Sequence, residues 1–313
     1  AECRFMLLSP NNLLKPSDGG LVAVPSQDMV LGIYYLTQER PGAKGEGKFF
    51  KSVNEAILAY DNQEATLHSR VKVRVSKTMP DGTVKTGVIE STIGRFIFNE
   101  IIPQDLGFVD RKDPENRFKY EIDFLVTKKE LGKIINKCIH KHPSTETCVV
   151  LDNIKSLGYK YSTIAALTVS VSDMVIPPEK ETYIEEAEAE VAKINKMFRR
   201  GLMTDEERHN KVISVWEQAD GKITDALLAG LGTYNEIYMM AHSGARGSNR
   251  QIKQLGGMRG LMASPSGETI ELPIKSNFRE GLSVQEYFIS AHGARKGLSD
   301  TALRTADSGY LTR

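Results

Sequence analysis

The clearest pattern of apolar and polar positions lies in the second half of the chain and predicts a helical hairpin. A first heptad seam, with steps of 3, 4, 3 and 4, runs through Ile184, Ala187, Val191, Ile194 and Phe198. A second seam, with steps of 4, 3, 4 and 3, runs through Val212, Trp216, Ala219, Ile223 and Ala226. Gly201 ends the first helix, and Thr204 with Glu207 forms a capping box that starts the second. Because the connecting turn is short, the two helices are expected to lie antiparallel.

A further long helix is predicted at the end of the chain. Steps of three and four residues connect Tyr287, Ala291, Ala294, Leu298, Ala302, Ala306 and Tyr310. A helix from about Val284 to Arg313 would be roughly 45 Å long. A domain of this size cannot bury such a rod along its whole length, so we expect a strut that crosses a space. Gly293, Gly297 and Gly309 each cost about 1 kcal/mol relative to Ala, so the strut should be bendable.

The first half of the chain has shorter, mixed patterns. Residues 1–37 are interpreted as loops and short extended pieces that include the apolar run Met29–Leu36, and residues 41–47 as a surface loop. A short helix is expected over Val53–Tyr60. Alternating residues predict strands at Val71–Val75 and Val84–Ile89, joined into a hairpin by a turn at Pro80-Asp81-Gly82.

Three more segments complete the prediction for this half. Ile93–Ile102 is an apolar, β-leaning stretch ended by a proline, whereas Lys128–Ile139 has a helical pattern. Residues 149–176 are mixed and end at Pro177-Pro178, which is the strongest candidate boundary in the chain. The predicted fold class is therefore α+β with several domains: a mixed domain with short strands, an antiparallel helical hairpin and a long helix.

Composition narrows the classes of protein to which the chain can belong. It has 313 residues, 40% of them hydrophobic and 26% charged, which is typical of soluble domains. No apolar run reaches the length of a membrane span, and three Cys make a disulfide scaffold a poor interpretation. A net charge of +1 excludes a globally basic nucleic-acid coat. Residues 241–313, however, carry ten basic against six acidic side chains, a local charge of +4.

No motif in the chain forms a complete active site. Cys138, His140, His142 and Cys148 have the ligand types of a zinc site, but their spacing does not converge them, so a buried Cys with surface His is the preferred interpretation. No phosphate loop, nucleophile elbow or paired carboxylates occur. The Arg-Gly segments at 244–248 and 256–260 suit phosphate oxygens, but a solvated connection explains them equally well.

Several long segments resemble the largest-subunit (β′) family of bacterial RNA polymerases. They are Pro25–Gly32, Gly94–Glu100, Asn235–Met240, Ser243–Ser248, Gly257–Ala263, Asn277–Leu282 and Tyr287–Arg313. The resemblance implies an internal piece of that subunit, with residues 1–176 as the pore region, 177–265 as the funnel with its helical hairpin, and 266–313 as the start of the cleft domain with the bridge helix. Two positions depart from the family: His242 stands where Asp is expected, and the Ile164–Leu167 stretch lacks an expected Gly.

The resemblance also implies roles for particular residues. Contacts to the template at the active site are implied for Arg304, Thr305, Ala306, Tyr310 and Arg313. Basic and hinge positions of the bridge helix correspond to Gly293, Arg295, Lys296 and Gly297. Arg246 and Gln254 match a loop that supports the bridge helix, and Asn210 and Lys211 match contacts of secondary-channel regulators and ppGpp.

By the same resemblance, the whole enzyme is a DNA-directed RNA polymerase, a nucleotidyltransferase in which a metal assists the attack of the RNA 3′-hydroxyl on an NTP. Its Mg²⁺ ligands and Zn²⁺ sites are expected outside this chain, which alone should be inactive. Implied partners are the β, α, ω and σ subunits, template DNA, nascent RNA and NTPs, in the bacterial cytoplasm with the nucleoid. The alternative is a free-standing, non-catalytic helical-hairpin scaffold that binds protein or nucleic acid.

Overall fold

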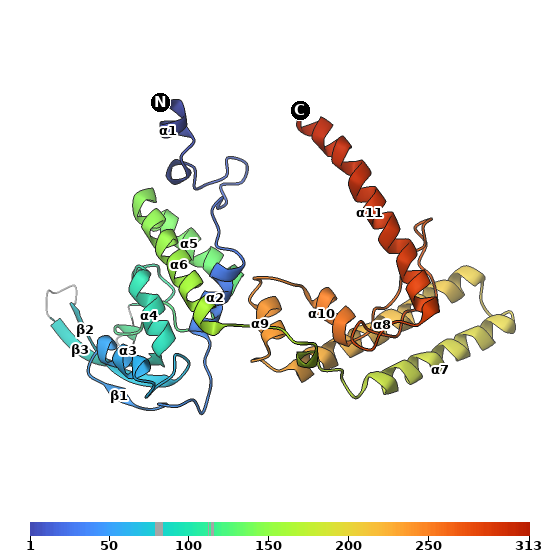
Figure 1. Cartoon of the computed structure of the whole chain (residues 1–313), viewed down its shortest axis with the longest axis horizontal. Coiled ribbons are helices and arrows are strands. Elements are labelled where there is room, and N and C mark those ends of the chain that lie inside the picture. Colours follow the sequence, from blue (N-terminus) through green and yellow to red (C-terminus); the bar gives the residue numbers. More distant parts are fainter. Residues whose placement is uncertain (79–83, 112, 114–115) are drawn as a thin grey trace. The chain divides into compact units, whose positions relative to one another are not determined.

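A computed structural model describes residues 1–78, 84–111, 113 and 116–313, and it divides the chain into two compact units. Unit 1 comprises Ala1–Leu167 and Met239–Arg246, and unit 2 comprises Thr168–Tyr238 and Gly247–Arg313. Unit 1 combines helices with a small sheet, and the described part of unit 2 is built from helices and loops (Figure 1). The predicted α+β class is confirmed.

The sheet of unit 1 contains the predicted hairpin. Its strands are β1 (Phe49–Phe50), β2 (Arg70–Thr78) and β3 (Val84–Thr92), in the order β1-β2-β3. β1 is parallel to β2, and β2 pairs with β3 in antiparallel register, with Val73 opposite Ile89. Val71 and Val73 are fully buried, as the alternating pattern of β2 predicts. The predicted turn at Pro80-Asp81-Gly82 lies outside the described residues.

Helices make up most of the rest of unit 1. They are α1 (Glu2–Met6), η1 (Ser9–Asn11), α2 (Asp28–Thr37), α3 (Val53–Asp61), α4 (Ile93–Ile101), α5 (Lys128–Lys141) and α6 (Ser144–Ala165). A further helix, α9 (Glu236–His242), crosses the division between the units. The helices predicted over Val53–Tyr60 and Lys128–Ile139 are confirmed as α3 and α5.

Three predictions for unit 1 were wrong. The β-leaning stretch Ile93–Ile102 is helix α4 for most of its length, because the Thr92 side chain accepts a hydrogen bond from the Arg95 amide and caps a helix there. The loops expected in residues 1–37 include α2, whose burial on most sides leaves no amphipathic signal. Residues 149–165, expected to be mixed, belong to α6.

Helices α2 and α6 cross at a contact that two glycines make possible. A Cβ built on Gly32 would lie 1.9 Å from the carbonyl oxygen of Gly158, and one built on Gly158 would lie 2.6 Å from the carbonyl oxygen of Met29. Only residues without a side chain allow two helix backbones to approach this closely. The crossing therefore depends on glycine at both positions.

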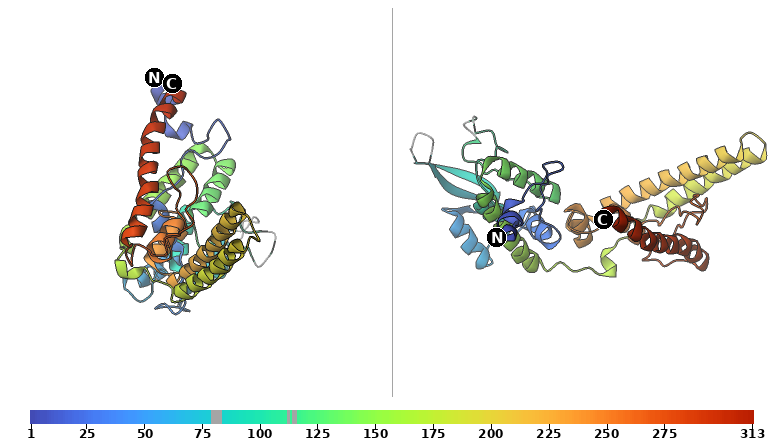
Figure 2. Two further views of the ribbon diagram at one scale, coloured as in Figure 1. Left: turned by 90° about the vertical axis from the view of Figure 1, so that its right-hand side faces the viewer. Right: turned by 90° about the horizontal axis from the view of Figure 1, so that it is seen from above.

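Unit 2 contains the predicted hairpin of α7 (Lys180–Arg199) and α8 (Asp205–Leu231), which lie side by side and antiparallel (Figures 1 and 2). The capping box is confirmed, since the Thr204 hydroxyl accepts from the Glu207 amide and the Glu207 carboxylate accepts from the Thr204 amide. The end of the second seam differs from the prediction. Ala226 is only half-buried, whereas Leu227 is fully buried. An α-helix has 3.6 residues per turn and a heptad seam has 3.5, so the buried side of a straight helix drifts away from a strict heptad.

The remainder of unit 2 contains η3 (Val171–Asp173), α10 (Asn249–Gly256) and the last helix, α11 (Val284–Thr312). Residues 260–276, named here the β-bridged loop, fold back on themselves through the antiparallel bridges Gly260–Ile274 and Ala263–Thr269. The predicted long helix is confirmed as α11, which continues without a break through all three of its glycines.

Candidate nucleic-acid interface

The first turn of α11 is fixed by a carboxylate that caps it. The Glu286 carboxylate accepts from the Ser283 amide at 2.9 Å, while the Ser283 hydroxyl accepts from the Glu286 amide at 3.3 Å. Ser276 of the β-bridged loop donates to the same carboxylate from its amide at 3.3 Å and its hydroxyl at 3.0 Å. Although desolvation opposes the charge, the hydrogen bonds from Ser283 and Ser276 lower the pKa of Glu286. The start of α11 is thus tied to the loop that precedes it.

The next two turns of α11 lie against the β-bridged loop. A Cβ built on Gly293 would lie 3.5 Å from the Ala263 carbonyl oxygen and 3.7 Å from the Met262 methyl group. The Lys296 ammonium donates to the Pro265 carbonyl oxygen at 2.8 Å. These contacts support the helix up to Lys296.

Beyond that point α11 is uncovered within the described part of the chain. All residues from 301 to 313 are exposed, and Tyr310 and Leu311 are 85% and 87% exposed. The hydroxyl of Thr305 donates to the carbonyl oxygen of Thr301 in its own helix at 2.7 Å. An exposed helical half with large apolar side chains needs a partner, and every predicted template contact lies on it.

The two sides of α11 differ in charge. At 100° per residue, Thr305, Ala306, Tyr310 and Arg313 fall within about 140° of the helix surface, and Arg295 lies in line with Arg313. The acidic residues of α11 lie on the opposite side: Glu286, Asp300 and Asp307. Arg304 shares that opposite side, in line with Gly293. One side of α11 as a whole therefore presents small residues, an aromatic ring and two guanidinium groups, without a carboxylate.

The remaining predicted site residues are distributed over both units. Arg246 is exposed in unit 1, whereas Gln254 is half-buried in unit 2, where its carbonyl oxygen accepts from the Phe278 amide at 3.0 Å. Asn210 and Lys211 are exposed in the second turn of α8, next to the turn of the hairpin. Gly297 has open space around its Cα.

Sequence reasoning missed a cluster at the end of the hairpin. The Arg208 guanidinium forms two parallel bonds to the Glu271 carboxylate, at 2.6 and 2.7 Å, and His209 Nδ1 lies 2.8 Å from the same carboxylate. The hydrogen bonds from Arg208 and His209 lower the pKa of Glu271 to about 2. Because more than 60 residues separate the partners, no local pattern connects them.

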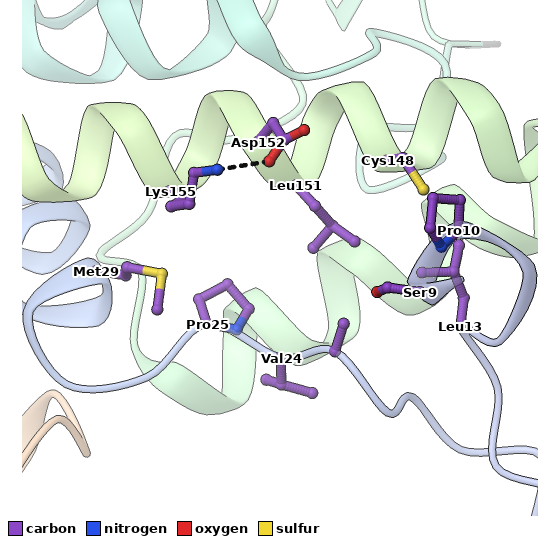
Figure 3. A pocket seen from close by; sticks show the side chains of 11 residues that line it. Ser9, Pro10, Leu13, Val24, Pro25, Met29, Cys148, Leu151, Asp152 and Lys155 are labelled. Atoms are coloured by element: carbon purple, nitrogen blue, oxygen red, sulfur yellow. Dashed lines mark hydrogen bonds and ion pairs between the residues drawn. The ribbon is translucent and has the colours of Figure 1, made fainter. Parts of the chain in front are cut away.

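The residues considered for zinc have separate surroundings. Cys138 is buried beside the Thr147 hydroxyl, and His142 lies between Asp105 and Glu146, at 2.8 and 3.1 Å. Cys148 instead lines a cavity of about 370 Å³ beside Leu151 and Pro10 (Figure 3). Within the described residues, no three His, Cys, Asp or Glu side chains gather as metal ligands do. None of the residues predicted to contact the template, the regulators or the bridge helix lines this cavity.

One comparison with known proteins covers almost the whole chain. Residues 12–174 match the family RNA polymerase Rpb1, domain 3; residues 184–279 match RNA polymerase Rpb1, domain 4; and residues 281–313 match RNA polymerase Rpb1, domain 5. None of the described helices is long and apolar enough to cross a membrane.

Similar full-length proteins are DNA-directed RNA polymerase subunits beta′. That of Lachnoclostridium phytofermentans is 68% identical over all of this chain and 25% of its own length. Those of Acetivibrio thermocellus and Clostridioides difficile are each 62% identical over all of this chain, and over 27% and 26% of their own lengths. The chain thus spans about a quarter of the length of the curated relatives that it matches.

Proposed function

Since this chain belongs to the RNA polymerase Rpb1 family and matches bacterial β′ subunits along its whole length, we propose that it acts as a segment of such a subunit during RNA synthesis on a DNA template. In this proposal α11 is the bridge helix that holds the template at the active site. The hairpin of α7 and α8 borders the channel through which NTPs enter. The enzyme works in the bacterial cytoplasm with its β, α, ω and σ subunits.

One observation carries the proposal: α11 has a small, basic side that carries no carboxylate and that continues into its exposed half. Thr305 turns its hydroxyl toward its own helix, so its methyl group and that of Ala306 form a low surface that a flat base can approach. Arg295 and Arg313 lie on the same side, and guanidinium groups pair with phosphate oxygens. Tyr310 adds a ring on which a base can stack.

The chain's own residues bind and orient nucleic acid in this proposal and do not hold the catalytic metal. By the family resemblance, the Mg²⁺ ligands lie outside this chain. We therefore assign the Mg²⁺ ligands to other parts of the β′ subunit. Asn210 and Lys211, exposed beside the hairpin turn, are assigned to regulators of the channel and to ppGpp.

The alternative of a free-standing scaffold depended on the hairpin alone. The family matches extend over both units and α11, and not only over the hairpin. No observation favours the scaffold.

A pair of variants in the assembled polymerase tests the role of α11. Ala306→Leu places a larger side chain on the proposed template side, and Ser308→Leu places the same side chain about 160° away on the same exposed helix. We expect Ala306→Leu to slow the addition of a single nucleotide at least tenfold more than Ser308→Leu, in complexes of equal assembly. Equal rates for the two variants would overturn the assignment of this side to the template.

A further inference from the structure

We propose that Glu271, held by Arg208 and His209, is a joint that positions α11 by fixing the β-bridged loop to the start of α8. The inference depends on the proposed function only for its effect on RNA synthesis. Its structural part, that the hairpin and α11 share one support, concerns unit 2 alone. Glu271, Arg208 and His209 are positioning residues in this proposal, since they touch neither template nor substrate.

The geometry of the joint distinguishes it from an ordinary surface ion pair. Arg208 contacts both oxygens of Glu271 with its two terminal nitrogens, and His209 provides a third bond to the same carboxylate. The guanidinium is fixed from its other side by Asp205, at 2.9 Å from its Nε, and lies 5.2 Å from the centre of the Phe198 ring. A forked, charge-assisted pair is shorter and more directional than a single ion contact. Arg208 therefore cannot turn away from Glu271 without losing several contacts.

The β-bridged loop connects this joint to α11. Glu271 lies in its returning arm, between the partners of the two bridges, Thr269 and Ile274. The opposite arm contains Met262 and Ala263, which lie under Gly293, and Pro265, which accepts from Lys296. The two arms are paired directly with each other through the two bridges, so a displacement at Glu271 also moves the arm on which α11 lies.

Two further contacts show that the loop connects the hairpin with α11. Lys275, just beyond Glu271, pairs with Glu188 of α7. Its neighbour Ser276 donates to Glu286, the carboxylate that caps α11. The loop is thus attached both to the two helices of the hairpin and to the first turns of α11.

Because α11 is long, a small change in its support at the base displaces its exposed half. From Gly297 to Thr312 the helix extends about 24 Å without a described contact outside itself. A tilt of about 5° at the base therefore moves the far end by roughly 2 Å. A misplacement of about 1 Å at a reacting centre is enough to slow a reaction a hundredfold. The joint consequently acts on the proposed template side without touching it.

The test uses the assembled polymerase with a full-length β′ subunit. Glu271→Gln removes the charge of the joint at constant volume. Glu268→Gln is the matched control, because it removes an exposed carboxylate from the same loop but leaves Arg208, His209 and Glu271 in place. We expect Glu271→Gln to raise amide hydrogen exchange about tenfold in residues 261–271 and 284–296. It should also lower the maximal rate of nucleotide addition several-fold with an unchanged KM for NTP. Glu268→Gln should change each of these quantities less than twofold.

A charge exchange separates a specific joint from general loosening. Arg208→Glu combined with Glu271→Arg and Asp205→Asn restores an ion pair at the same place without a second carboxylate beside position 208. This triple variant should recover at least half of the lost protection and rate. Its failure to improve on Glu271→Gln would overturn the proposal.

The remaining outcomes distinguish this inference from the proposed function. Unchanged exchange in Glu271→Gln overturns the joint, even where Ala306→Leu slows addition and so upholds the proposed function. Faster exchange with unchanged addition overturns the positioning role. If Ala306→Leu is also without effect, the proposed function has failed. Faster exchange in Glu271→Gln would then still show that the hairpin and α11 are held by the same loop.

Discussion

The substitution Gly32→Ala is expected to loosen the crossing of α2 and α6 in unit 1. Its added Cβ would lie 1.9 Å from the Gly158 carbonyl oxygen and 2.8 Å from the Ser162 amide nitrogen. Both neighbours are backbone atoms, which cannot turn aside as the end of a side chain does. The helices would have to separate by roughly 1.5 Å to restore ordinary van der Waals distances.

The free energy of this change has two opposing parts. Overpacking of a close-packed interior costs about 1–3 kcal/mol, and this contact belongs at the upper end of that range because both partners are backbone. Replacing a glycine inside a helix by alanine recovers about 1 kcal/mol. The net destabilisation is therefore about 2 kcal/mol, which corresponds to roughly a thirtyfold change in an opening equilibrium.

Amide hydrogen exchange in the assembled subunit measures this opening directly. Exchange should become about thirtyfold faster in α2 and in the part of α6 around Gly158 in the Gly32→Ala variant. Gly132→Ala in α5 is the matched control, because a Cβ there has open space around it, and it should leave exchange unchanged or slower. Wild-type exchange in α2 and α6 of the Gly32→Ala variant would refute the reasoning.

Three further predictions concern other parts of the chain. Ala166 has a left-handed φ of 47°, which strains an L-residue. Ala166→Gly should therefore stabilise the end of α6 by up to about 1 kcal/mol and slow amide exchange there. Faster exchange would contradict this prediction. The hydrogen bonds that the His142 ring donates to the carboxylates of Asp105 and Glu146 raise the pKa of His142. The contribution of His142 to the attachment of residues 103–108 is therefore full below about pH 6.5 and is lost as pH rises through the raised pKa. Exchange in residues 103–108, corrected for intrinsic rates, should show this loss, and His142→Gln should abolish it. Asn210→Ala combined with Lys211→Ala should weaken the binding of channel regulators to the polymerase, and unchanged affinity would remove these residues from that surface.

The repeating patterns of the chain correctly predicted its most regular elements. The two helices of the hairpin, the capping box at Thr204 and the long helix α11 were all predicted, because each follows from spacings of three or four residues within one element. The strand pair β2 and β3 was predicted for the same reason, since alternation places Val71 and Val73 on one face.

The secondary structure of short apolar segments was harder to predict, because their environment decides between helix and strand. Ile93–Ile101 has the composition of a strand, yet it is a helix capped by Thr92 and placed so that Gly94 meets the Leu36 carbonyl oxygen. Helix α2 is buried on most sides and so has no polar face to reveal its period.

By itself the sequence determined which segments have a period, where the hairpin turns and where α11 begins, because these properties depend on neighbours a few positions apart. The resemblance to a family supplied the proposed roles of individual residues. Only the tertiary structure decided which distant residues meet: Glu271 with Arg208, Gly32 with Gly158, and Lys296 with Pro265. Hydrogen bonds and van der Waals contacts act over a few ångströms in space, whatever the separation along the chain, so their partners are fixed only when the chain has folded.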